Sequence, residues 1–146
     1  MRQAAGMSLV ELLVVLAVAG IALGASALYL RPMEAPLQTG ATDLEGFLRQ
    51  ARGRALATTS AYRIVPSNSR VIEAEFAANC GASTWTSDSG VVLELPRQVT
   101  MTDTSWSVCF NSRGLADSNL VVSLTHPSAG SRQVEVLRGG AARVLP

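Results

Sequence analysis

Two residues near the start of the chain have a spacing that predicts a specific local chemistry. Ser8 and Glu11 are separated by two residues, and Glu11 stands at the head of an apolar run. In an S-x-x-E capping box, the serine oxygen accepts from the backbone N–H of the glutamate, whose carboxylate accepts from the backbone N–H of the serine. A carboxylate in the first helical turn also complements the helix dipole. Capping is one explanation of this acid, but Ser, Thr or Asn alone would cap the helix without placing a charge beside the apolar run.

The apolar run that follows is long enough to cross a membrane. No charged residue occurs from Leu12 to Leu30, a stretch of 19 residues, and about 20 are needed to span the hydrocarbon core. The short leader at the start of the chain carries Arg2 and no acid, which predicts a cytoplasmic N-terminus. A secretory signal peptide cleaved near "ASA" at 25–27 is the alternative. The length of the run and its initial acid favour a retained membrane anchor.

The two cysteines, Cys80 and Cys109, can form a disulfide if this part of the chain lies outside the cytoplasm. They lack the close spacing of a zinc knuckle, and the chain has one histidine, so we expect no Cys/His zinc site. A disulfide would close a loop of about 30 residues and contribute about 3–4 kcal/mol to stability. Two buried free thiols are the alternative.

The remaining reactive residues form no recognisable catalytic set. His126, the sole histidine, precedes Pro127 and is expected to be a solvated turn residue. The chain contains no G-x-S-x-G elbow, P-loop, G-x-G-x-x-G or H-E-x-x-H motif. Trp85 and Trp106 lie near the cysteines in sequence and are expected to pack beside a disulfide. We therefore predict a protein that is not an enzyme, with no metal and no cofactor.

The stretch "GMSLVELLVVL" at 6–16 resembles the processing site of type IV pilins and type II secretion pseudopilins. The resemblance implies that a prepilin peptidase cuts after Gly6 and that Met7, which departs from the usual Phe, becomes the N-methylated first residue. It also implies that Glu11, the fifth mature residue, pairs with the Met7 amino group of a neighbouring subunit during filament assembly. A charge in an apolar zone costs a few kcal/mol unless it is paired, and a buried pair contributes register more than stability.

A second helix is predicted after a kink between about 31 and 37, where Pro32 and Pro36 interrupt the pattern. Its apolar residues recur at spacings of three and four, which is typical of an amphipathic helix. They are Leu37, Ala41, Leu44, Leu48, Ala51 and Ala55. Glu45 and Arg49 form an i,i+4 pair on the polar side.

After Thr58 the pattern changes to short runs of period 2, which indicate strands. The predicted strands are 61–65, 71–77, 91–95, 98–101, 106–110, 120–125 and 132–138, with turns at 66–69, 88–90, 111–114 and 126–130. Strands that follow helices predict an α+β fold. We expect a long N-terminal helix, half transmembrane and half amphipathic, packed on a C-terminal antiparallel sheet or small sandwich.

Three later segments narrow the resemblance. The stretches at 43–65, at 108–117 ("VCFNSRGLAD") and at 132–145 ("RQVEVLRGGAARVL") are similar to the FimT/GspH group of minor pilins and pseudopilins. The resemblance implies four parts. They are a prepilin leader (1–6), a transmembrane polymerisation helix (7–30), the amphipathic half of the helix (31–58) and an extracytoplasmic β-rich domain (59–146).

The function implied is that of a structural subunit processed by prepilin peptidase. It would assemble with other pilins or pseudopilins into a type IV pilus or type II secretion pseudopilus, or prime its assembly. The protein would sit in the bacterial inner membrane as a single-pass protein, with its C-terminal domain in the periplasm. A membrane-anchored periplasmic protein of unknown activity stays open as another class.

A basic C-terminal segment keeps a third class open. Arg132, Arg138 and Arg143 fall in the last fifteen residues, where Glu135 is the sole acid. Some FimT-like minor pilins bind DNA during natural transformation through such a segment, and three arginines could bind phosphates weakly and with strong salt dependence. The segment here is less densely basic, so DNA is not the expected partner. The alternative role is that of solvated edge residues that discourage strand pairing.

Overall fold

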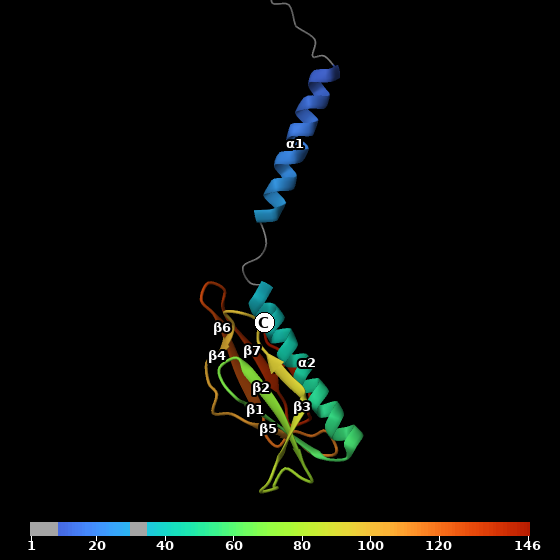
Figure 1. Ribbon diagram of the computed structural model, residues 1–146, viewed down its shortest axis with the longest axis vertical. Helices are drawn as coiled ribbons and strands as arrows, with labels where there is room; N and C mark the ends of the chain where they lie inside the picture. Colours follow the sequence, from blue (N-terminus) through green and yellow to red (C-terminus); the bar gives the residue numbers. More distant parts are fainter. Residues whose placement is uncertain (1–8, 30–34) are drawn as a thin grey trace, which may run out of the picture. The chain divides into compact units, whose positions relative to one another are not determined.

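The computed structural model describes residues 9–29 and 35–146, with side chains described for 9–21 and 36–146. The chain divides into two units, Met1–Pro32 and Met33–Pro146, and each is described by itself. The elements are α1 (Leu9–Tyr29), α2 (Ala35–Thr58), β1 (Ala61–Pro66), β2 (Val71–Ala77), β3 (Thr86–Glu94), β4 (Thr100–Met101), β5 (Val108–Phe110), β6 (Leu120–His126), β7 (Gly130–Val136) and β8 (Ala142–Val144) (Figure 1).

Helix α1 is apolar around its whole circumference. Its 21 residues carry one acid, Glu11, in the first turn. The large apolar side chains from Leu9 to Ile21 are exposed, most of them by more than half. A helix without a polar face cannot be solvated on one side and buried on the other, so it requires apolar surroundings on every side. Ser8, the proposed cap, lies outside the described residues.

Helix α2 buries the predicted stripe. The six residues at spacings of three and four, Leu37, Ala41, Leu44, Leu48, Ala51 and Ala55, are all at most 1% exposed. Pro36 sits in the first turn, where its missing N–H leaves no hydrogen bond unmade. The helix stops after Thr58 because Thr59 adopts a left-handed conformation, with φ of 53°. The kink was predicted between about 31 and 37. Residues 35–37 of that range already belong to α2, and residues 31–34 lie outside the described residues.

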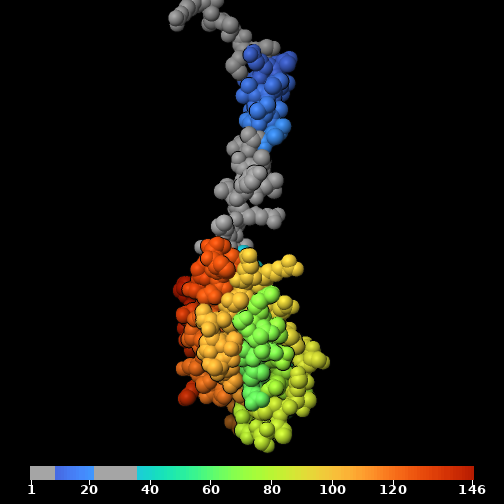
Figure 2. All heavy atoms as spheres, turned by 60° about the vertical axis from the view of Figure 1, so that its left-hand side comes forward, coloured from blue at the N-terminus to red at the C-terminus, as the bar shows by residue number. Residues whose placement is uncertain are grey.

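The strands form two four-stranded antiparallel sheets. Sheet A has the order β3-β2-β1-β5, and sheet B has the order β4-β6-β7-β8. Figure 2 shows the green strands of sheet A beside the orange segment that leads to β5, which pairs with β1. Sheet B meets the turn between β1 and β2, where the Met101 N–H donates to the Ser69 carbonyl at 2.8 Å. The alternative of a two-sheet arrangement is therefore the one observed.

Helix α2 packs on both sheets, and a single core lies between the three layers. Its largest fully buried side chains include Phe110, Leu44, Ile64, Ile72 and Leu124. One residue of each alternating pair points inward, as β1 shows with Tyr62 and Ile64 buried. The core thus joins the helical stripe to the inner faces of both sheets.

Two sequence predictions within this domain were wrong. The "DSG" stretch at 88–90 was expected to be a turn, but it lies inside β3, where the register with β2 shifts between Glu73 and Glu75. The local bond from the Gly90 N–H to Asp88 Oδ1, at 3.1 Å, shapes a bulge rather than ending the strand.

His126 was expected to be solvated in a turn, but it is the last residue of β6 and only 8% exposed. It pairs with Gly130 across the hairpin, and the Ser128 N–H donates to its Nδ1 at 3.3 Å. The turn signal in "HPSAG" was correct, but the turn begins one residue later than expected. The histidine is therefore explained as a structural residue of the hairpin.

Candidate functional site

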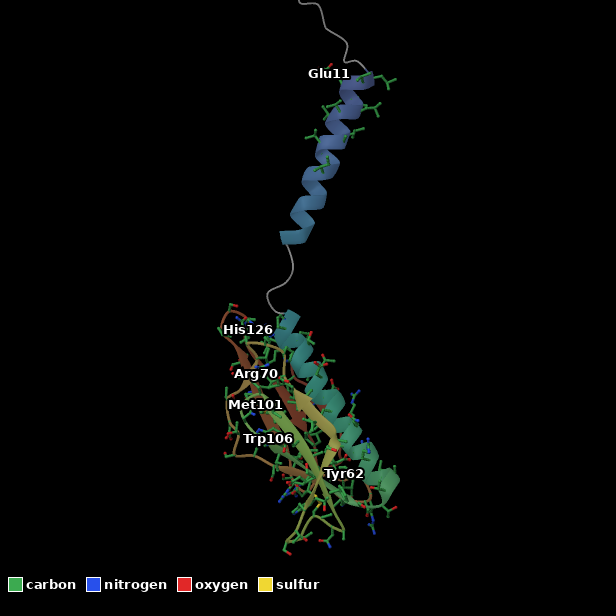
Figure 3. All side chains as sticks on the ribbon, in the orientation of Figure 1. Glu11, Tyr62, Arg70, Met101, Trp106 and His126 are labelled. Atoms are coloured by element: carbon green, nitrogen blue, oxygen red, sulfur yellow. A yellow bond between two sulfur atoms is a disulfide. The ribbon has the colours of Figure 1, made fainter. Side chains whose placement is uncertain are left out.

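Of the three residues predicted at the N-terminal site, the structure describes Glu11. Gly6 and Met7, the predicted processing residues, lie outside the described residues. Glu11 lies in the first turn of α1, where its side chain is exposed among exposed apolar residues (Figure 3). Within the described residues, no helix is both long and apolar enough to cross a membrane.

The two cysteines are joined, as the sequence predicted. A disulfide links Cys80, in the loop after β2, to Cys109 in β5, with Cα atoms 5.9 Å apart. Cys109 pairs with Arg63 across the β1–β5 ladder. The disulfide therefore ties the β2–β3 loop to β5, the edge strand of sheet A opposite β3.

The side chains of Arg63, on β1, and Trp85, the residue before β3, pack against each other. The Arg63 guanidinium lies 4.3 Å from the centre of the Trp85 ring and donates from Nε to Glu75 at 2.9 Å. The pair combines a cation–π contact with a charge-assisted hydrogen bond. Trp106 instead packs against the core and donates to the Asp103 carbonyl at 3.1 Å. The expectation that both tryptophans lie beside the disulfide remains a prediction.

A polar cluster ties helix α2 to the bulge in β3. The Tyr62 hydroxyl donates to Asp88 Oδ2 at 3.1 Å, and Arg54 Nη1 lies 3.6 Å from the same carboxylate. Burial, together with the hydrogen bond to Asp88, raises the pKa of Tyr62 above its usual value of 10.0. The tyrosine therefore acts as a hydrogen-bond donor at neutral pH, and the cluster is a structural clamp.

The three C-terminal arginines do not form one free cluster. Arg143, on β8, pairs with Glu135 at 2.7 Å. Arg138 is exposed in the turn between β7 and β8, and Arg132 is half-buried on β7. One of the three charges is thus neutralised by the sole acid of the segment. Phosphate binding by these residues stays a prediction.

Sequence reasoning missed a groove at the end of α2. Arg49, Arg52, Gly53 and Leu56 line it together with residues 140–142, around a cavity of about 400 Å³. Among the described residues, Arg52 Nε is buried without a hydrogen-bond partner. The sequence signal was the Gly139–Gly140 pair, which marked a turn but did not indicate which helical residue it faced. No cluster of metal-ligating side chains occurs within residues 9–29 and 35–146.

Comparison with known protein families identifies the start of the chain. Residues 1–27 match the model of the prokaryotic N-terminal methylation motif. The match includes the stretch in which the sequence predicts processing and the acid Glu11. No curated protein sequence matches this chain.

Comparison with solved structures identifies the fold of the second unit. The chain resembles a crystal structure of the type IV minor pilin FimU of Pseudomonas aeruginosa, with a TM-score of 0.60 and 16% identity, over 75% of this chain and 88% of that chain. It also resembles the minor pseudopilin EpsH from the Type 2 Secretion System of Vibrio cholerae, with a TM-score of 0.57 and 10% identity. This match covers 75% of this chain and 95% of that chain. These likenesses confirm the predicted α+β fold of a helix packed on an antiparallel β domain.

Proposed function

We propose that the chain is a minor pilin or minor pseudopilin, a structural subunit that works by assembly rather than by catalysis. One observation carries the proposal: the same chain joins an N-terminal methylation motif to a globular domain with the fold of FimU and EpsH. Either feature alone is less specific, because a fold hosts several functions and a short motif says nothing about the domain behind it. Their combination supports assembly with other pilins or pseudopilins.

Processing is the first step of the proposed function. A prepilin peptidase would cut after Gly6 and leave Met7 as the methylated N-terminus. The match to the methylation motif over residues 1–27 supports this step. The uncharged run from Leu12 to Leu30 supports insertion of the helix in the inner membrane, with residues 59–146 outside the cytoplasm.

Glu11 would then direct docking into the filament. Its carboxylate is exposed among apolar side chains, so in an apolar filament core or in a bilayer it would be costly without a cation. The Met7 amino group of a neighbouring subunit would supply that cation. Since a buried pair fixes register better than it adds stability, the charge would select the correct position along the filament.

The experiment compares Glu11→Gln with wild type in the host cell. The amide keeps the size of the side chain and removes its charge. We expect the variant to be processed normally, to accumulate in the membrane and to be depleted from filaments sheared off the cells. Glu45→Gln is the control, because Glu45 also lies on a helix but pairs within the chain with Arg49 at 2.6 Å. Equal incorporation of Glu11→Gln and wild type would refute this role.

A further inference from the structure

The Arg52 groove is the feature of the globular unit that the proposed function leaves unexplained. Gly140 lines the groove, and it meets Gly114, from another loop, next to the Arg52 side chain. Gly114 and Gly140 both adopt left-handed conformations, with φ of 72° and 80°. A Cβ added to Gly140 would collide with the Gly114 carbonyl oxygen and would lie 2.8 Å from Arg52 Nε. The absence of a side chain at Gly140 therefore permits a close contact between the two loops and the Arg52 side chain.

Backbone hydrogen bonds fix both loops in place. The Gly114 N–H donates to the Asn111 carbonyl at 2.8 Å, and the Gly140 N–H donates to the Leu137 carbonyl at 2.7 Å. The two loops are also joined to each other, because the Ala116 N–H donates to the Arg138 carbonyl at 3.0 Å. The two loops beside Arg52 are thus preorganised, which lowers the entropy cost of binding.

Arg52 is the groove arginine whose charge is left unbalanced. Arg49, about one turn before it, pairs with Glu45, and Arg54, two residues after it, pairs with Asp88. Within the described residues, Arg52 forms no such ion pair, and its buried Nε has no acceptor. Since Nε is buried, a ligand would bind at the two Nη nitrogens. Parallel donors of this kind bind a carboxylate in a bidentate manner.

Apart from two arginines and two glycines, the groove is lined by apolar side chains. They are those of Leu56, which is 48% exposed, Ala141 and Ala142. One unbalanced cation among small apolar side chains suits one carboxylate next to an apolar residue. A nucleic acid backbone would need several free cations in a row. The charge and shape of the groove therefore favour a protein segment.

We propose that the Arg52 groove is a docking site for an aspartate or glutamate side chain of a neighbouring pilin-type subunit, with an apolar residue of that subunit packed on Leu56. This inference rests on the proposed function, because a filament is what brings such a subunit to the groove. It concerns a contact made by the globular domain, separate from the pairing proposed for Glu11. The groove would set which subunit can lie beside this one.

The test places a photocrosslinking amino acid at Leu56 in the full-length protein, in host cells that assemble filaments. Val121, on β6, is the matched control position because its exposure is also 48%. We expect the Leu56 probe to crosslink to another filament subunit, at a peptide containing Asp or Glu. Arg52→Gln should reduce that yield about tenfold, the change expected from the loss of one charge-assisted hydrogen bond. Arg52→Lys should give a Leu56 crosslinking yield between those of wild type and Arg52→Gln. The crosslinking yield at Val121 should not change in either variant.

Two checks keep the outcomes distinct. Arg97→Gln, which removes an exposed arginine elsewhere on the domain, should leave the Leu56 crosslink unchanged. Resistance of the domain to protease would show that Arg52→Gln is folded. Two results would overturn the groove inference alone, in a wild-type chain that is incorporated into filaments. One is a Leu56 crosslink whose yield does not change in Arg52→Gln. The other is a Leu56 crosslink to nucleic acid. A wild-type chain absent from filaments would overturn the proposed function and this inference with it.

Discussion

The Tyr62 hydroxyl lies 3.1 Å from Asp88 Oδ2 and joins β1, an inner strand of sheet A, to the bulge on the edge strand β3. The bond fixes the part of β3 that the sequence had indicated as a turn. Its energy is that of a hydrogen bond to a charged acceptor, about 1.5–3 kcal/mol. Because α2 reaches the same carboxylate through Arg54, the bulge is held from two sides.

Changing Tyr62 to Phe tests this clamp through pH. Burial and Asp88 raise the pKa of Tyr62 in the folded state, so the folded state holds the phenolic proton more tightly than the unfolded state does. The contribution is full below pH 10 and is lost as the pH rises from 10 through the raised pKa. We expect alkaline unfolding curves of wild type to fall more steeply above pH 10 than those of Tyr62→Phe. Parallel curves would contradict the clamp.

Removal of the disulfide should lower stability by about 3–4 kcal/mol, because the bond closes a loop between residues 29 apart in the sequence. Denaturant unfolding of the detergent-solubilised full chain, wild type against Cys80→Ser/Cys109→Ser, measures the difference. Reductant should destabilise wild type by a similar amount and leave the double variant unchanged. Insensitivity of wild type to reductant would show that the cysteines are not paired.

Changing Thr59 to Gly should stabilise the domain by about 1 kcal/mol. Thr59 ends α2 at a φ of 53°, where a β-branched residue is strained and glycine is not. Thr58→Gly is the control and should destabilise, because Thr58 is helical and its hydroxyl donates to the Arg54 carbonyl at 2.8 Å. The change in the denaturation midpoint decides the matter, and a loss of stability in Thr59→Gly would contradict the strain.

Changing Gly140 to Ala should destabilise by about 3 kcal/mol, since the methyl group would meet the Gly114 carbonyl oxygen in a left-handed conformation. Gly46→Ala and Gly53→Ala are the matched controls. Both lie in α2, where an added Cβ meets nothing within 4 Å, and each should stabilise by up to about 1 kcal/mol. Thermal unfolding of the three variants measures the contrast. A neutral Gly140→Ala would mean that the two loops do not touch.

Nucleic-acid binding can be tested with the full chain and a duplex DNA at low salt. We expect no mobility shift, because Arg143 is paired with Glu135 and the segment holds few other charges. A measured affinity that is lost on changing Arg138 and Arg143 to Ala would contradict this expectation. The same variants retain the groove arginine Arg52, so the two surfaces can be separated.

The helices were predicted well because their signals are local. The spacing of the buried residues in α2 follows directly from 3.6 residues per turn, and Glu45 and Arg49 meet as the i,i+4 rule requires. The strands were located with errors at their ends. The strand predicted at 91–95 begins at Thr86, because "DSG" makes a bulge that only its pairing with β2 reveals.

Local signals also decide how much of the candidate site could be predicted. The N-terminal motif is contiguous, so its residues could be read in order. The contact of Arg52 with Gly114 and Gly140 joins three segments far apart in the sequence, and no spacing rule relates them. The burial of His126 likewise depends on the hairpin register rather than on the neighbouring Pro127.

The most direct test of the central claim is the intact mass and N-terminal peptide of the protein extracted from the membranes of its own host. We predict a chain that starts at Met7 and carries one added methyl group on its amino nitrogen. A chain that starts at Met1, in cells whose other pilins are processed, would contradict it. In that case Glu11 would be a helix-capping residue, and the filament role would lose its basis.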